Sequence, residues 1–75
     1  KDINIMSDKT LIILAENLKK YRIKNGYSRK ELAATVGVTS SYIGQIENAK
    51  KYCSIILLYK IAQLYQIKVQ NFLEQ

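Results

Sequence analysis

Apolar residues recur along this chain at the spacing of amphipathic helices, and no segment shows the strict alternation of a half-buried strand. The clearest run marks one helix face at the i, i+3, i+4, i+7 positions: Leu11, Leu14, Ala15, Leu18 and Tyr21. Gly26 follows this run, and glycine readily takes the left-handed conformation that ends many helices. The pattern therefore predicts a first helix from Asp8 to Lys24.

Capping residues predict where the following helices begin and end. Ser28 with Glu31 three positions later forms a capping-box pattern, and the short helix that it begins ends at Gly37. Thr39 and Ser54 are suitable N-caps for a third and a fourth helix. The fourth helix carries an inward stripe: Ile55, Leu58, Ile61, Ala62 and Tyr65. A last short helix over residues 69–73 closes the core, so we expect an all-α, five-helix domain.

The third helix, at about residues 40–48, has two contrasting faces. Ile43 and Ile46 share the face that turns toward the core. The opposite face is small, polar and uncharged: Ser40, Ser41, Gly44, Gln45 and Asn48. A polar helix face is normally just solvated, so it needs a second observation before it indicates binding.

Composition narrows the function more than it narrows the fold. With 75 residues the chain has room for one domain, and 48% hydrophobic and 24% charged residues are typical of a globular protein. No apolar run approaches the length of a membrane span, and we expect a cytoplasmic protein. The single Cys53 and the lack of histidine exclude an internal disulfide, a Cys/His metal site and His-dependent catalysis, so we expect no enzyme, metal or cofactor. A net charge of +6 favours an anionic partner, either nucleic acid or a membrane surface.

The segment from Arg29 to Asn48 provides the second observation. Two short helices that meet at a tight turn need a small residue where they would collide, and Ala33 stands there. They also need a positive φ in the turn, which Gly37 supplies. The apolar positions that seat both helices are filled as well: Leu32, Val36, Val38, Ile43 and Ile46. This pattern predicts a helix-turn-helix, whose second helix enters the major groove of DNA.

The chain resembles the phage-repressor and Cro-like (XRE-type) helix-turn-helix proteins from about Leu11 to Leu73. The matching stretches are RIKNGYS at 22–28, ELA at 31–33, GVT at 37–39, IGQIEN at 43–48, KIA at 60–62 and FL at 72–73. The resemblance implies a bacterial or phage regulator of transcription that binds double-stranded operator DNA, usually as a symmetric homodimer on a palindromic site. Prophage repressors, restriction-modification controllers and antitoxins fit equally well, and a protein partner such as a toxin or RNA polymerase stays open.

The resemblance also assigns individual residues to DNA. Base edges would be read from the outward face of the third helix, by Ser40, Ser41, Gly44 and Gln45. Gln45 is the strongest candidate for specificity, because its amide can pair with adenine N6 and N7 at once. Contacts to the DNA backbone would come from Arg29, Lys30, Thr39, Tyr42, Asn48, Lys50 and Lys51. Gly44 offers no side chain, which would let Tyr42 or Gln45 lean inward or would lower the helix against the bases.

Two further features concern the scaffold of the domain. The resemblance implies a partly buried ion pair between Arg22 and Glu47, which would join the first helix to the third; the alternative is a solvated Glu47 that contributes almost nothing. Ala49 and Gln66 stand where the family usually has glycine after the third and fourth helices, which leaves those helix ends open. Cys53 is expected to be a small apolar filler rather than a reactive thiol.

The remaining predictions concern assembly and the chain ends. Apolar residues outside the core stripe predict a homodimer surface: Ile56, Leu57, Tyr59, Leu64 and Phe72. Residues 1–7 are an N-terminal arm or a cloning remnant, and residues 8–75 form the helix-turn-helix domain. Two alternatives to DNA binding stay open, a protein-interaction module and a basic helix on a membrane surface, of which the core-type stripes and the tight turn disfavour the second.

Overall fold

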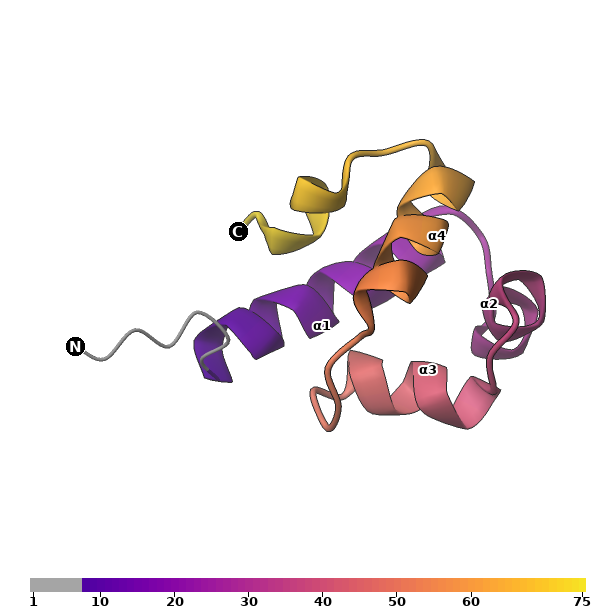
Figure 1. The fold of residues 1–75 in the computed structure, drawn as a ribbon, viewed down its shortest axis with the longest axis horizontal. Helices are drawn as coiled ribbons and strands as arrows, with labels where there is room; N and C mark the ends of the chain where they lie inside the picture. Colours follow the sequence, from indigo (N-terminus) through magenta and orange to yellow (C-terminus); the bar gives the residue numbers. More distant parts are fainter. Residues whose placement is uncertain (1–7) are drawn as a thin grey trace.

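The chain is described by a computed structural model over residues 8–75, as four α-helices and a terminal 3₁₀ helix (Figure 1). They are α1 (Asp8–Lys24), α2 (Arg29–Val36), α3 (Ser40–Glu47), α4 (Ile55–Tyr65) and η1 (Val69–Leu73). No strand occurs among these residues, so the all-α class is confirmed, with the fifth helix wound as 3₁₀ rather than α. The predicted N-terminal arm lies outside the described residues.

The N-terminus of each inner helix is capped by the side chain that the sequence pattern predicts. Ser28 Oγ accepts a hydrogen bond from Glu31 N at 3.0 Å, while Glu31 Oε1 accepts one from Ser28 N at 2.9 Å. Thr39 caps α3 in the same way, and Ser54 caps α4. These bonds satisfy backbone donors that have no partner inside the helix, and for this reason local sequence sets the helix starts.

Each α-helix is followed, within two residues of its last residue, by a residue with a left-handed backbone: Gly26, Gly37, Ala49 and Gln66. The two residues that replace the family's glycine still adopt the glycine conformation, each with a φ of 59°. After α3, Lys50 N donates to Gln45 O at 2.9 Å and Ala49 N donates to Ile46 O at 3.3 Å. These bonds satisfy the last carbonyls of α3. The ends of α3 and α4 are therefore glycine-type turns made without glycine, at some cost in backbone strain at Ala49 and Gln66.

We expect Ala49→Gly to stabilise the domain. A left-handed backbone costs a residue with a Cβ about 1–2 kcal/mol, and the greater freedom of glycine in the unfolded chain removes about 0.4–1 kcal/mol of that gain. Urea denaturation should therefore show a net increase of roughly 0.5–1 kcal/mol. The matched control is Ala34→Gly at an exposed position of α2, where the backbone is helical and a loss of about 1 kcal/mol is expected. Equal losses in both variants would contradict the strain at Ala49.

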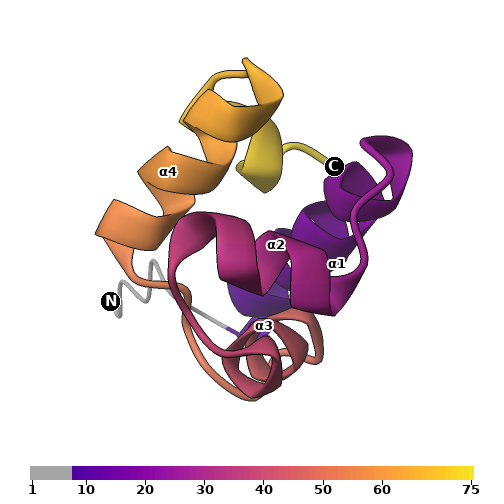
Figure 2. The same cartoon turned by 90° about the vertical axis from the view of Figure 1, so that its right-hand side faces the viewer.

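The core lies where α1, α2 and α4 meet above α3, which forms the lower edge of the domain in both views (Figures 1 and 2). Phe72, Ile43, Ile46 and Ile61 are the largest fully buried side chains. The helix α1 packs on η1 and α3, while α2 packs on α3 and α4. One side of α3 is therefore covered by the rest of the domain, and its other side is left at the surface.

Two residues assigned to a dimer surface lie in the core of the protomer, so that part of the prediction is wrong. Leu57 is 4% exposed and Phe72 is 0% exposed. Because α4 packs against α2 on one side and η1 on the other, its buried arc is wider than a single stripe and includes Leu57. Ile55, predicted to point inward, lies at the margin of that arc in the first turn and is 61% exposed. Leu64 is partly buried against the core.

A buried amide on α1 ties down the C-terminal end of the chain, and the sequence pattern gives no sign of it. Asn17 is 9% exposed, and its Nδ2 donates to Phe72 O at 2.8 Å and to Glu74 O at 2.7 Å. The amide thus satisfies carbonyls at the end of η1, where no further turn of helix supplies donors. This contact holds η1 over α1 and keeps Phe72 in the core.

Candidate nucleic-acid interface

The corner between α2 and α3 is built as the helix-turn-helix pattern requires. Ala33 is 3% exposed at the crossing of the two helices, and Gly37 takes a φ of 81°. The amides of Gly37 and Val38 both donate to Ala33 O, at 2.9 and 3.0 Å, which closes α2 before the chain turns. The apolar residues Leu32, Val36, Ile43 and Ile46 are buried beneath the corner. This packing determines how α3 is presented.

The polar face of α3 lies at the surface. Ser40, Ser41 and Asn48 are exposed, and Gly44 and Gln45 are partly exposed. In Figure 2, α3 is seen close to end-on, with the rest of the domain on one side of it. The predicted contrast between a core face and an outward face is therefore confirmed, and the outward face carries hydrogen-bonding groups without formal charge.

A buried ion pair joins α1 to α3, as predicted. Arg22 Nε donates to Glu47 Oε2 at 2.7 Å, and Arg22 Nη2 donates to Glu47 Oε1 at 3.1 Å. Arg22 and Glu47 are 8% and 7% exposed. Arg22 Nη1 also donates to Tyr27 O at 2.8 Å, so all three nitrogens of the guanidinium are bonded. The bond to Glu47 outweighs burial and raises the pKa of Arg22, which stays charged at every relevant pH.

A second arginine reaches the same carboxylate, which sequence reasoning missed. Arg29 Nε donates to Glu47 Oε1 at 3.1 Å, and the Arg29 side chain remains 39% exposed. Its Nη1 lies 3.5 Å from the place where a Cβ of Gly44 would stand. Arg29 and Glu47 are 18 residues apart on different helices, so no helical spacing rule connects them. The Arg22–Glu47–Arg29 cluster therefore depends on how α2 and α3 pack.

The residues assigned to the DNA backbone fall into two groups. Lys30, Asn48, Lys50 and Lys51 are exposed with Thr39, whose Oγ1 accepts from Tyr42 N as the cap of α3. Tyr42 differs from them, because its hydroxyl donates to Tyr52 O and accepts from Ser54 N, both at 3.2 Å. Of the alternatives for Gly44, the one in which Tyr42 leans inward is therefore wrong: the Tyr42 hydroxyl ties α3 to the segment that leads into α4.

Other chemistry is sparse in the described residues. Between residues 8 and 75 no cluster of three acidic or cysteine side chains could hold a metal, and no helix has the length and apolar character to cross a membrane. Burial raises the pKa of Cys53 to about 11 and that of Tyr65 to about 12, so both stay protonated at neutral pH. The half-buried Cys53 packs on the core, in agreement with a filler role.

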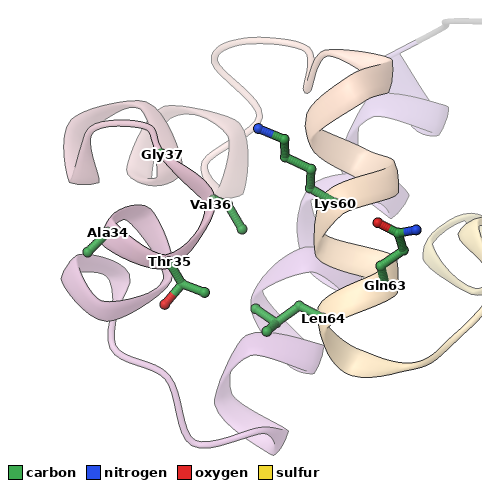
Figure 3. A pocket seen from close by; sticks show the side chains of 7 residues that line it. All are labelled: Ala34, Thr35, Val36, Gly37, Lys60, Gln63 and Leu64. Carbon is green, nitrogen blue, oxygen red and sulfur yellow. The ribbon is translucent and has the colours of Figure 1, made fainter.

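An open hollow of about 530 Å³ lies between the end of α2 and the side of α4 (Figure 3). Lys60, Gln63 and Leu64 border it from α4, and Lys60 is the one charged side chain among its lining residues. Figure 3 shows Leu64 between the two helices, next to Thr35 and Val36. None of the residues assigned to DNA lines this hollow, so it is separate from the polar face of α3.

Comparisons with known proteins agree with this architecture. A model of the helix-turn-helix family matches residues 18–72. The HTH-type transcriptional regulator SinR of Bacillus subtilis (strain 168) is 34% identical over 64 residues, which are 84% of this chain and 58% of SinR. The chain thus spans less than two thirds of that relative.

Two solved structures share the fold at significant identity. The restriction-modification controller protein C.AhdI from Aeromonas hydrophila has a TM-score of 0.76 and 26% identity, over 83% of this chain and 94% of that one. SinR, described as the master regulator for biofilm formation and solved in complex with DNA, has a TM-score of 0.74 and 34% identity, over 81% of this chain and 98% of that one.

Proposed function

Because this chain belongs to the helix-turn-helix family, we propose that it is a non-catalytic, sequence-specific regulator of transcription that places α3 in the major groove of double-stranded DNA. The observation that carries this function is the exposed, uncharged polar face of α3, held on a corner by the buried Arg22–Glu47 pair and by Gly37. Uncharged polar groups form hydrogen bonds with base edges, whereas charged groups on this face would bind any phosphate regardless of the sequence. The relative solved with DNA supports the same partner.

We propose that the residues around α3 form one group that faces the bases and another that contacts the DNA backbone. Ser40, Ser41, Gly44 and Gln45 face the bases, and Gln45 reads adenine. Arg29, Lys30, Thr39, Asn48, Lys50 and Lys51 contact the sugar-phosphate backbone, and the net charge of +6 supports that contact. The engaged hydroxyl of Tyr42 leaves it a structural role. The protein would need no cofactor and would act in the cytoplasm.

We further propose that it binds a palindromic operator as a homodimer. Ile56 and Tyr59 remain exposed on α4, at 66% and 57%, and Ile55 lies beside them. Apolar side chains gathered on one helix are covered at low cost by a second copy related by a two-fold axis. The two α3 helices would then reach half-sites about 34–36 Å apart.

Selection from random duplexes tests the DNA-binding function. We expect an enriched palindrome that binds at least ~10³-fold more tightly than random DNA, and a log K that falls steeply with log salt. Gln45→Ala should lose about 1–3 kcal/mol of discrimination at one position of each half-site while random DNA binds as before. The matched control is Gln63→Ala, an exposed glutamine on α4. Recovery of no enriched sequence would favour the protein-interaction module instead.

Analytical ultracentrifugation at micromolar concentration tests the dimer. We expect Ile56→Asp to stop self-association and to weaken operator binding, because a charge in an apolar interface lacks a partner. The melting temperature of the protomer should barely change, since Ile56 is exposed. The control is Ile23→Asp, which changes an isoleucine on α1 that is 59% exposed. A wild-type protein that stays monomeric both free and on operator DNA would contradict the dimer.

A further inference from the structure

Gly44 lies inside α3, where neither the backbone nor the packing of the fold calls for glycine. Its φ is not among the positive ones, and glycine in a helix interior is less stable than alanine. A Cβ at this position would meet only Arg29, at 3.5 Å from Nη1 and 3.9 Å from Cζ, which are ordinary contacts. A methyl group therefore fits, whereas a branched side chain would press on the guanidinium.

The Arg29 side chain lies beside the space that a large side chain at position 44 would enter. Its Nε is bonded to Glu47 Oε1, and its Nη1 lies over Gly44. Within residues 8–75, Nη1 and Nη2 of Arg29 take part in no hydrogen bond, and the side chain is 39% exposed. Gly44 follows Ser40 by one helical turn and Ser41 by three residues, so the guanidinium emerges at the edge of the outward polar face.

The charge of the cluster points to an anion at this edge. Two guanidinium groups share the single carboxylate of Glu47, so the three side chains carry one net positive charge. Arg22 is 8% exposed and has all its nitrogens bonded, which leaves Arg29 as the member that reaches solvent. A phosphate accepts paired, charge-assisted hydrogen bonds from a guanidinium in the geometry that Nη1 and Nη2 offer.

We propose that Gly44 is a positioning residue for DNA binding, because its missing side chain leaves the slot on α3 in which Arg29 lies and from which Arg29 binds a DNA phosphate. The bond to Glu47 holds the guanidinium beside Gly44 before DNA arrives, which reduces the entropy lost on binding. This inference rests on the proposed DNA-binding function and adds to it a coupling between Gly44 and Arg29.

A double-mutant cycle measures that coupling on the selected operator and on a random duplex. We expect Gly44→Ala to keep the wild-type salt slope on both DNAs, because a methyl group leaves Arg29 in place, and to melt at a higher temperature. Gly44→Val and Arg29→Ala should each weaken binding to both DNAs, on the order of tenfold or more, and lower the salt slope by about 1. Adding Gly44→Val to Arg29→Ala should cause no further loss. Valine is a better helix former than glycine, and thermal melts check that each variant is folded.

A second measurement on the free protein separates this inference from the proposed function. In ¹H–¹⁵N spectra the Arg29 Nε–Hε signal should exchange slowly with water in the wild type and in Gly44→Ala, and rapidly in Gly44→Val. Slow exchange of the Arg29 Nε–Hε proton in Gly44→Val would contradict the proposed slot, whatever the DNA-binding measurements show. Losses that multiply in the double mutant, or a salt slope in Gly44→Ala that falls as far as in Gly44→Val, would overturn the coupling. If the Arg29 signal exchanges as expected but the wild type binds no DNA, the slot stands, and the phosphate contact and the proposed function are both overturned.

Discussion

Glu47→Ala should lose about 3–5 kcal/mol of folding free energy and leave the domain largely unfolded near 37 °C. The substitution removes the carboxylate that Arg22 and Arg29 share and leaves the buried Arg22 guanidinium without its counter-charge. An unpaired charge in a protein interior is far more costly than a lost surface ion pair. Chemical denaturation followed by circular dichroism measures the loss directly.

Two further variants make the Glu47 prediction specific. Glu47→Gln keeps the shape of the side chain and removes its charge, so it should also destabilise strongly. Glu16→Ala removes an exposed carboxylate from α1 and should stay within about 0.5 kcal/mol of wild type. If Glu47→Ala unfolds at the same denaturant concentration as Glu16→Ala, the carboxylate is not the buried partner of two arginines.

Phe72→Ala should lose about 3–5 kcal/mol as well, although the residue lies near the end of the chain. Phe72 is 0% exposed, and its ring packs on Tyr21 in a T-shaped arrangement with 5.5 Å between ring centroids. Removing the ring leaves a cavity between α1 and η1, because the hydrogen bonds from Asn17 still hold η1 over α1. Denaturant melts over a hundredfold range of protein concentration measure the loss.

The concentration series tests whether Phe72 lies in the core of the protomer rather than in a dimer interface. A substitution at a core residue destabilises the protomer itself, so the loss of folding free energy relative to wild type should be the same at every protein concentration. Leu73→Ala, at a neighbouring side chain that is 48% exposed, should cost much less. A loss for Phe72→Ala that disappears in dilute protein would instead place the ring in a dimer interface.

Local signals predict much of the fold because helix ends are decided by near neighbours. The bounds of α1 and α2 follow from apolar spacing, caps and glycines that act within a few residues. The helix-turn-helix corner follows for the same reason, since Ala33 and Gly37 respond to constraints that lie close in sequence. The outward face of α3 could be predicted as well, because the 3.6-residue period separates it from Ile43 and Ile46.

Residues at the edges of faces could not be assigned in this way. A periodic pattern locates the centre of a buried arc but not its width, which depends on how many neighbours a helix has. Leu57 is buried because both α2 and η1 pack against α4, while Ile55 is exposed because it lies at the margin of that arc. Burial of Asn17 likewise depends on carbonyls 55 and 57 residues away.

By itself, then, the sequence determined the helices, their caps, the tight corner and the polar face of α3, all through interactions between residues close along the chain. Only the tertiary structure decided which apolar residues are covered, where the Asn17 amide finds its acceptors, and that Arg29 lies over Gly44 with its Nε on Glu47. The physical reason is that burial and long-range polar contacts depend on how helices approach one another in space, and spacing along one helix does not contain that information.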